Sequence, residues 1–128
     1  MSAPEIAALD AALDRAGENV TLKRTVKRSG ADVVASVTCR AAVRSVSADQ
    51  IAGTIAVTDL AVIISPTQIL AASWPGANDS IPAENLVDQR LPKITDKMVV
   101  QGRERQVKVS KPIYVGGEWV RTDMVVAG

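Results

Sequence analysis

The chain has 128 residues, of which 47% are apolar and 2% aromatic, it lacks phenylalanine, and its formal net charge at pH 7 is +1. This length suits one domain with its own core, which must be built from Val, Ile, Leu and Ala. β-Branched side chains favour strands, and a net charge near zero excludes a global field that draws the protein to nucleic acid or membrane. We therefore expect a single domain, residues 1–128, of mainly β structure.

The sequence is poor in residues that perform chemistry. It has no histidine, and Cys39 is its one cysteine. The commonest general base and metal ligand is therefore missing, and so are an internal disulfide and a cysteine-rich zinc site. Glycine-rich phosphate loops and nucleophile motifs are also absent. We expect no enzymatic activity, metal or cofactor, and we expect Cys39, which alternates with apolar residues, to be a small core residue.

An N-terminal helix is predicted within residues 1–17. Ile6, Leu9 and Leu13 recur at helical spacing among alanines, and Gly17 follows as a stop signal. A helix this short is marginal alone, so it should pack on its own barrel or on an adjacent subunit. The sequence shows neither a signal-peptide pattern nor an apolar run of membrane-spanning length, so we expect a cytoplasmic site of synthesis and no membrane partner.

Residues 19–128 are expected to form the β domain. Glycines in Gln101-Gly102 and Gly116-Gly117 supply the positive φ of tight hairpin turns. Apolar alternation predicts six strands, near residues 20–26, 33–45, 54–64, 97–101, 104–111 and 118–126. The prediction is a small antiparallel β-barrel or sandwich of about six strands with an N-terminal α-helix and a long loop.

Two further segments interrupt the strands. Ser65–Ala72 resembles a short capped helix with Pro66 at its first position. Residues 74–92 contain several prolines and a glycine, which predicts a long loop. Long loops in compact domains are usually functional or mobile, although a plain surface loop is the alternative.

Charge is unevenly distributed along the chain. Residues 20–44 carry six bases and one acid, residues 45–89 carry five acids and no base, and residues 90–111 carry seven bases and two acids. Such blocks either form faces of opposite sign, which suit a subunit that contacts copies of itself, or reflect chance clustering on solvated strands.

Four segments carry a family resemblance: residues 63–67, 74–76, 96–109 and 112–121. They resemble the head–tail joining, or head-closure, proteins in the neck of tailed bacteriophages, and the related connector proteins of prophages and gene transfer agents. The resemblance covers about residues 20–128. In that family the segment corresponding to residues 96–109 is a β-hairpin of the barrel, so the motifs are structural rather than catalytic.

The resemblance implies a structural virion protein that forms a homo-oligomeric ring, usually of six or twelve subunits. The ring would close the DNA-filled capsid and dock the tail. Its partners would be portal or adaptor proteins and tail tube or tail terminator proteins, with double-stranded DNA passing through the lumen without sequence specificity. The chain would be made in the bacterial host cytoplasm and located in the virion neck. Its alanine-rich helix and low aromatic content depart from many relatives, which leaves its exact station in the neck open.

The residues expected at interfaces fall into three groups. Helix residues should pack on the chain's own barrel or on an adjacent subunit: Ile6, Leu9 and Leu13. Basic residues should pair with acids of the next subunit: Arg24, Lys27, Arg28, Arg40 and Arg44. Loop residues should contact a neighbouring ring or the lumen: Trp74, Asn78, Asp79, Glu84 and Asp88.

Three alternatives stay open at this point. The chain can be a tail terminator or tail-completion protein, which is also a ring former, or a housekeeping β domain outside the virion. From another class, it can be an OB-like nucleic-acid-binding module. Single-strand binders stack bases on aromatic rings, and this chain offers Trp74, Tyr114 and Trp119. Trp119 is expected in the core because it alternates with apolar residues, whereas Tyr114 fits either place.

Overall fold

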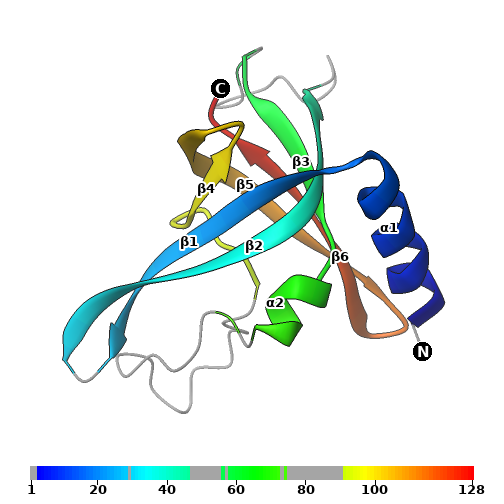
Figure 1. Cartoon of the computed structure of the whole chain (residues 1–128), viewed down its shortest axis with the longest axis horizontal. Coiled ribbons are helices and arrows are strands. Elements are labelled where there is room, and N and C mark those ends of the chain that lie inside the picture. Colours follow the sequence, from blue (N-terminus) through cyan, green and yellow to red (C-terminus); the bar gives the residue numbers. More distant parts are fainter. Residues whose placement is uncertain (1–2, 29, 47–55, 57, 73, 75–90) are drawn as a thin grey trace.

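The structure is a computed structural model that describes residues 3–28, 30–46, 56, 58–72, 74 and 91–128. These residues form two helices and six strands, which follow one another along the chain as α1 (Ala3–Ala16), β1 (Glu18–Arg28), β2 (Ala31–Ser45), β3 (Leu60–Ile64), α2 (Thr67–Ala71), β4 (Lys97–Val100), β5 (Arg103–Val115) and β6 (Glu118–Val126). Both helices lie outside the sheet, with α1 along one side of it (Figure 1).

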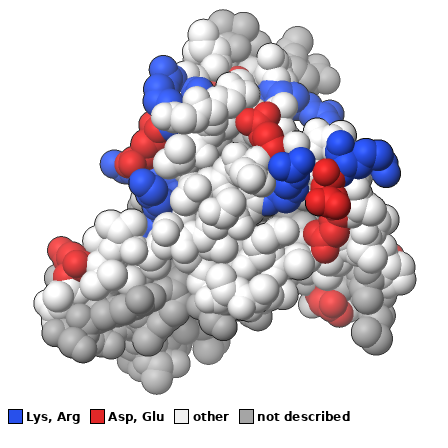
Figure 2. All heavy atoms as spheres, viewed as in Figure 1, with Lys and Arg blue, Asp and Glu red and all other residues white. Residues whose placement is uncertain are grey.

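The six strands form a closed barrel in the order β1-β2-β3-β6-β5-β4, and every pairing is antiparallel. Short pairings between Thr21–Lys23 of β1 and Lys97–Val99 of β4 complete the closure. Charged side chains of both signs lie on the outer surface (Figure 2). The predicted mainly β fold of about six antiparallel strands with an N-terminal helix is confirmed, and the barrel replaces the sandwich alternative.

Both predicted glycine hairpins are present. Gln101 and Gly102 connect β4 to β5 with φ values of 54° and 78°, and Gly116 and Gly117 connect β5 to β6 with 60° and 79°. Positive φ at both central residues is the mark of the type I′ turn, whose twist matches that of the flanking strands. The glycines at these turns therefore set the register of the C-terminal half of the barrel.

Strand β5 extends past the predicted end at residue 111, through Pro112, to Val115. Proline lacks the N–H that a central strand needs, so it is tolerated only at edges and bulges. Here β4 pairs with β5 only as far as Gln106, and the β5–β6 register shifts between Ile113 and Tyr114. Pro112 thus lies where β5 has one described neighbour, beside an irregularity.

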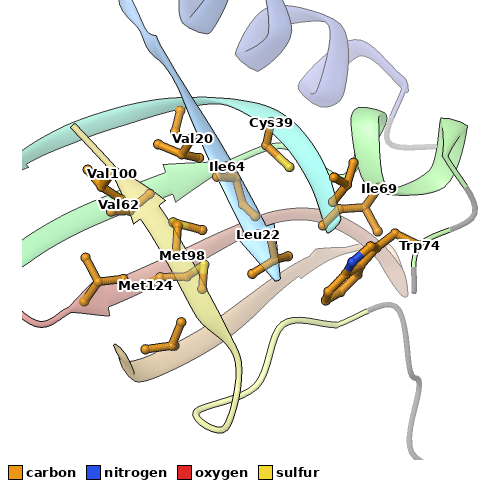
Figure 3. Packing of buried hydrophobic residues seen from close by; sticks show 14 of the residues in the cluster. Val20, Leu22, Cys39, Val62, Ile64, Ile69, Trp74, Met98, Val100 and Met124 are labelled. Carbon is orange, nitrogen blue, oxygen red and sulfur yellow. The ribbon is translucent and has the colours of Figure 1, made fainter. Parts of the chain in front are cut away.

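The barrel interior is filled by aliphatic and sulfur-containing side chains (Figure 3). The largest fully buried residues include Leu22, Ile64, Met98 and Met124 of the strands and Ile69 of α2, which packs against them. Burial of each such side chain contributes roughly 1.5–3 kcal/mol relative to exposure. The expectation of a core without phenylalanine, built mainly from Val, Ile, Leu and Ala, is therefore confirmed, with methionine filling two central positions.

Cys39 belongs to this core and is fully buried on β2. Burial raises the pKa of its thiol to about 12. At pH 8 roughly one molecule in 10⁴ then carries the reactive thiolate, since only the thiolate is nucleophilic. We expect the folded chain to resist a thiol reagent and to label fully in denaturant, as measured by mass spectrometry. Rapid labelling of the folded chain would contradict the burial.

The third strand is shorter than predicted. We expected residues 54–64, whereas β3 begins at Leu60, and Ala56, Thr58 and Asp59 are not in a strand. Asp59 accepts hydrogen bonds from the backbone N–H groups of Ala56 at 2.8 Å and Gly128 at 3.0 Å. Aspartate that bonds nearby backbone competes with strand pairing, which explains the later start. The other residues of that prediction lie outside the described part.

Asp59 is also the partner of Lys108, whose Nζ lies 2.8 Å from Oδ2. The Lys108 hydrogen bond, followed by that from Ala56, lowers the pKa of Asp59 below its ordinary value. The stability that this shift provides is complete above the unfolded pKa of about 4 and is lost as pH falls through the folded pKa. We expect Asp59→Asn to flatten the fall in stability below about pH 4, measured by urea unfolding across pH. An unchanged pH profile would contradict this role.

The two helices match their predictions with small shifts. Helix α1 ends at Ala16, and the Gly17 N–H donates to the Leu13 carbonyl at 2.7 Å. A Cβ on Gly17 would lie 2.7 Å from the Ala41 carbonyl oxygen, so only glycine lets the helix end approach β2 this closely. Helix α2 is shorter than Ser65–Ala72, with Pro66 as its N-cap rather than its first residue. Neither helix is long and apolar enough to cross a membrane, within the residues described.

Candidate interaction surfaces

The first projecting feature is the far end of the β1–β2 hairpin. The pairing of β1 with β4 ends at Lys23, and the pairing of β2 with β3 begins at Ala41. Residues 24–28 and 31–35, which we call the hairpin arm, are paired with each other and extend away from the barrel (Figure 1). Among the described strands the arm has no third neighbour, which is unusual for β structure in a small domain.

The arm is apolar on its inner face and exposed at its end. Val26 and Ala35 are buried, whereas every residue from Ala31 to Val34 is exposed. Val33 is 37% exposed and Val34 is 59% exposed. Two adjacent valines point to opposite sides of a strand, so the arm presents an apolar side chain on each face of its end.

A second projecting feature lies at the opposite end of the long axis of the molecule. There the β5–β6 hairpin ends beside the N-terminal end of α1 (Figure 1). Tyr114 is 51% exposed and Val115 is 41% exposed on this hairpin. Glu5, near the N-terminal end of α1, and Glu118, the first residue of β6, are exposed as well. We call Glu5, Tyr114, Val115 and Glu118 the helix-side patch.

These two places hold most of the exposed apolar bulk of the described chain. Six large hydrophobic residues are exposed in the described part of the chain, and four of them lie at these two places: Val33, Val34, Tyr114 and Val115. The other two are single residues, Leu70 on α2 and Ile94 before β4. Scattered single residues need no explanation, whereas paired ones at projecting ends are typical of contact sites.

Arg24 does not lie at a subunit surface, so the expectation that it pairs with an acid of the next subunit is wrong. Its Nε and Nη2 donate to Asp96 Oδ1 and Oδ2 at 2.7 and 2.8 Å, and Nη2 also donates to the Leu91 carbonyl at 2.9 Å. Both side chains are buried. Bidentate pairs of this kind are the strongest hydrogen-bonded ion pairs, so Arg24 fixes the segment before β4 to β1.

Trp74 was expected to contact a neighbouring ring or the lumen, and this too is wrong. The side chain is 3% exposed and belongs to the barrel core (Figure 3). Its Nε1 donates to the Ala35 carbonyl at 3.0 Å, and the Arg24 guanidinium carbon lies 4.4 Å from the ring centroid. Indole N–H groups need a partner when buried, and the β2 backbone supplies one.

Arg24, Trp74, Leu91 and Asp96 therefore form one unit, which we call the anchor cluster. It joins the two chain segments that border residues 75–90 and holds both against the base of the hairpin arm. The predicted loop of residues 74–92 is non-regular at its described positions 74, 91 and 92. The remaining loop candidates lie outside the described residues: Asn78, Asp79, Glu84 and Asp88.

Helix α1 packs on its own barrel, one of its two predicted places. Leu13 is 3% exposed, while Ile6 and Leu9 are half-buried. Arg40 on β2 donates from Nε to the Leu13 carbonyl at 3.0 Å and from Nη2 to the Asp14 carbonyl at 3.3 Å. Arginine near a helix C-terminus satisfies its last carbonyls and favours its dipole. Arg40 therefore has a role within the chain.

The structure gives less information on the other three basic residues that were expected to pair with the next subunit. Arg44 is exposed on β2. Lys27 and Arg28 lie in the last two positions of β1, opposite Asp32 and Ala31, and their side chains lie outside the described part. Pairing of these three residues with another subunit stays a prediction.

The charge blocks of the sequence pair with one another inside the chain. Arg24 of the first block pairs with Asp96 of the third, and Asp59 of the second pairs with Lys108 of the third. Lys23 and Lys97 flank Glu104 more loosely, each at 3.7 Å. On the face in Figure 2 acidic and basic groups accordingly alternate rather than separate into two fields.

An open groove of about 470 Å³ lies between α1, α2 and β2. Asp10 and Asp14 line it together with Arg40, and Thr67 Oγ1 donates to Asp10 Oδ2 at 2.6 Å. This hydrogen bond joins the two helices. The described residues contain no group of three or more His, Cys, Asp or Glu side chains that could hold a metal ion. The groove therefore offers polar contacts but no evident chemistry.

Comparison with protein-family models finds none that matches the chain, and comparison with curated proteins finds no match either. The two projecting ends were not singled out from the sequence. The signal for one of them was present, because the adjacent Val33 and Val34, three and four residues after Gly30, break the polar character expected of a hairpin end.

Proposed function

We propose that the chain is a structural virion protein of a tailed-phage neck, a ring-forming subunit that closes the DNA-filled capsid and docks the tail. The observation that carries the proposal is a closed barrel with apolar residues exposed at two projecting ends on opposite sides of it. Opposite, non-identical contact surfaces are what a heterologous interface needs, and such interfaces form a ring when the rotation from one copy to the next closes. The resemblance of residues 63–67, 74–76, 96–109 and 112–121 to head-closure proteins supports the same assignment.

The packed interior supports a structural role for the barrel itself. Leu22, Met98 and Met124 are almost completely buried at its centre, so the barrel is a solid body (Figure 3). In this proposal DNA passes along the central lumen of the assembled ring, not through the barrel of a single subunit. It contacts the protein without sequence specificity. No enzymatic step, metal or cofactor is part of the proposal.

The partners we propose are portal or adaptor proteins on the capsid side and tail tube or tail terminator proteins on the other. The ring would hold six or twelve copies, and its place would be the virion neck. We also propose that the chain segment between Trp74 and Leu91 contacts a neighbouring ring. The anchor cluster supports this role, because it fixes both ends of that segment to the same site on β1 and β2. A segment held this way can contact a neighbouring ring without weakening the barrel.

Nucleic-acid binding by an OB-like module is disfavoured by the aromatic residues. Trp74 and Trp119 are buried at 3% and 8% exposure, which leaves Tyr114 as the one exposed aromatic ring of the chain. Single-strand binders stack successive bases on several rings. The OB fold also has five strands, whereas this barrel has six.

The test is co-sedimentation of the purified chain with DNA-filled, tailless capsids of the phage or prophage that encodes it, followed by electron microscopy. We expect a ring of added density at the portal vertex, whose symmetry gives the number of copies. Binding to isolated tails in place of capsids would reassign the chain as a tail terminator. Binding to neither particle would overturn the proposal.

A further inference from the structure

We infer that an open hollow on the outer surface of the barrel, at the base of the hairpin arm where β1 meets β4, binds phosphate groups of the DNA backbone. The hollow measures about 300 Å³, and Lys23 and Lys97 line it. This inference rests on the proposed function, since it specifies which face of the subunit would point toward the DNA in the lumen of the ring.

Two like charges lie opposite each other at the seam that closes the barrel. Strands β1 and β4 pair through three residues each, and Lys23 is the direct partner of Lys97 in the last of these pairs. Leu22 and Met98, in the pair before, are buried in the core, so the two lysines point to the outer face. Like charges directly opposite on neighbouring strands are destabilising. The chain therefore holds two ammonium groups together where the fold by itself does not favour them.

Glu104 of β5 offsets only part of this charge. Its two carboxylate oxygens lie 3.7 Å from the ammonium nitrogens of Lys23 and Lys97, one oxygen to each. Charge-assisted hydrogen bonds are shorter, at about 2.7–2.9 Å. The three side chains are 36–54% exposed, so water screens both pairs. One carboxylate thus faces two ammonium groups, and one positive charge remains in surplus.

The other polar groups of the hollow suit a phosphate. Thr25 of β1 and Thr95, two residues before β4, are exposed and line it, and each hydroxyl can donate to a phosphate oxygen. Arg24 also lines the hollow, but its guanidinium is bound to Asp96, so these two charges cancel. Asp32 lies near the end of the arm and is not among the residues that line the hollow. The surplus charge is therefore not neutralised by another described acid of the lining.

The DNA backbone is the phosphate source that fits this site in a neck ring. Lysine ammonium groups bind backbone phosphates without reading sequence. Basic side chains lie along the side of the molecule that carries β4 (Figure 2). The net charge of the whole chain is only +1, so one site binds weakly and lets the DNA slide. A ring would repeat the same weak site around the duplex.

The site is tested by titrating the isotope-labelled full chain with a short DNA duplex at low salt and following its amide signals by nuclear magnetic resonance. We expect the largest shifts in residues 21–25, 95–99 and 104, and an affinity that falls as salt rises. No binding, or shifts centred on another face of the barrel, overturns the site.

Variants with matched charge make the test specific. Lys23→Gln combined with Lys97→Gln should weaken duplex binding about tenfold and lower the salt slope by about two. Lys111→Gln combined with Arg15→Gln removes the same charge from exposed residues elsewhere and should change the affinity at most about twofold. Glu104→Gln should strengthen binding about threefold, because both ammonium groups lose their competing carboxylate. Equal losses for the two double variants, or weaker binding by Glu104→Gln, overturn the site.

Stability separates phosphate binding from a purely structural role of the lysines. Lys97→Gln alone removes the repulsion across the seam, so the urea midpoint should stay the same or rise while duplex binding falls. A lower midpoint with unchanged duplex binding would assign Lys97 to the stability of the barrel and overturn the site.

Inorganic phosphate distinguishes the two sources of the ligand. At equal phosphate concentration it should displace little duplex from the chain, because it lacks the neighbouring phosphates of a backbone. Tighter binding of inorganic phosphate than of duplex would make the hollow a site for a free anion and overturn the assignment to DNA.

The outcomes also separate this site from the proposed function. If the chain forms a ring on capsids but does not bind duplex through Lys23 and Lys97, the phosphate site is wrong and the neck function stands. If duplex binding depends on these lysines but the chain binds neither capsids nor tails, the phosphate site stands and the neck function is wrong.

Discussion

Replacing Arg24 by methionine is expected to destabilise the chain by about 3–5 kcal/mol, because it leaves the buried carboxylate of Asp96 without its charged partner. The Asp96 side chain is fully buried, and after the change its described donor is the Lys93 N–H, at 2.8 Å. A carboxylate with one remaining hydrogen bond in a dry site cannot recover its lost hydration. Urea unfolding followed by circular dichroism at pH 7 measures the effect as a lower midpoint.

Arg121 supplies the control for this prediction. It also pairs with an aspartate through two hydrogen bonds, from Nε to Asp123 Oδ1 at 2.8 Å and from Nη2 to Oδ2 at 3.1 Å. These two side chains are 42% and 37% exposed, so water screens the pair. We expect Arg121→Met to cost no more than about 1 kcal/mol. Similar losses of stability for the two variants would show that burial of the Arg24–Asp96 pair does not increase the cost of removing its arginine.

A double variant separates the cost of an orphaned charge from the value of the pair. Arg24→Met together with Asp96→Leu removes both charges, and such replacements of buried pairs are often close to neutral. We expect the double variant to recover much of the stability that Arg24→Met loses. Failure to recover would mean that the hydrogen bonds from Arg24 to Leu91 and from Lys93 to Asp96 matter more than the ion pair.

Most of the fold was predictable because it depends on local patterns. The glycine pairs at residues 101–102 and 116–117, together with apolar alternation, predicted both C-terminal hairpins within a few residues. The start of β3 was not predicted, since the side chain of Asp59 bonds both to the nearby N–H of Ala56 and to that of Gly128, 69 positions later in the chain. A contact that distant leaves no mark on the local sequence.

The residues at the candidate interaction surfaces were predicted less well than the fold, and Arg24 shows why. It occupies the inward-facing alternation of Val20, Leu22 and Val26, so its burial could be foreseen from strand geometry. Its charge suggested a surface role, and the partner that makes burial possible, Asp96, lies 72 positions away. Trp74 was assigned to a loop by its neighbouring prolines, but its indole reaches back into the core. In both cases the distant hydrophobic or ionic partner, and not the neighbouring sequence, determines where the side chain lies.

Replacing Trp74 by alanine is the second change with a large expected effect, again about 3–5 kcal/mol, because it removes a fully buried indole from the core. Trp74→Phe should cost less, about 1–3 kcal/mol, since the ring remains while the Ala35 carbonyl loses its donor. Denaturant unfolding measures both. Equal losses for the two variants would show that the hydrogen bond, and not the ring, provides the stability.

The effects of Trp74→Ala and Arg24→Met should not add. The Arg24 guanidinium lies 4.4 Å from the centre of the Trp74 ring, so each single change already removes that contact, and the pair should lose less than the sum by about 0.5–2 kcal/mol. Leu70→Ala, on an exposed residue of α2, provides the additive control with Arg24→Met. Additive losses for Trp74 and Arg24 would mean that the two ends of the segment from Trp74 to Leu91 are held independently. A coupled loss would mean that one cluster holds both ends, so that a partner bound to that segment would act on β1 and β2 together.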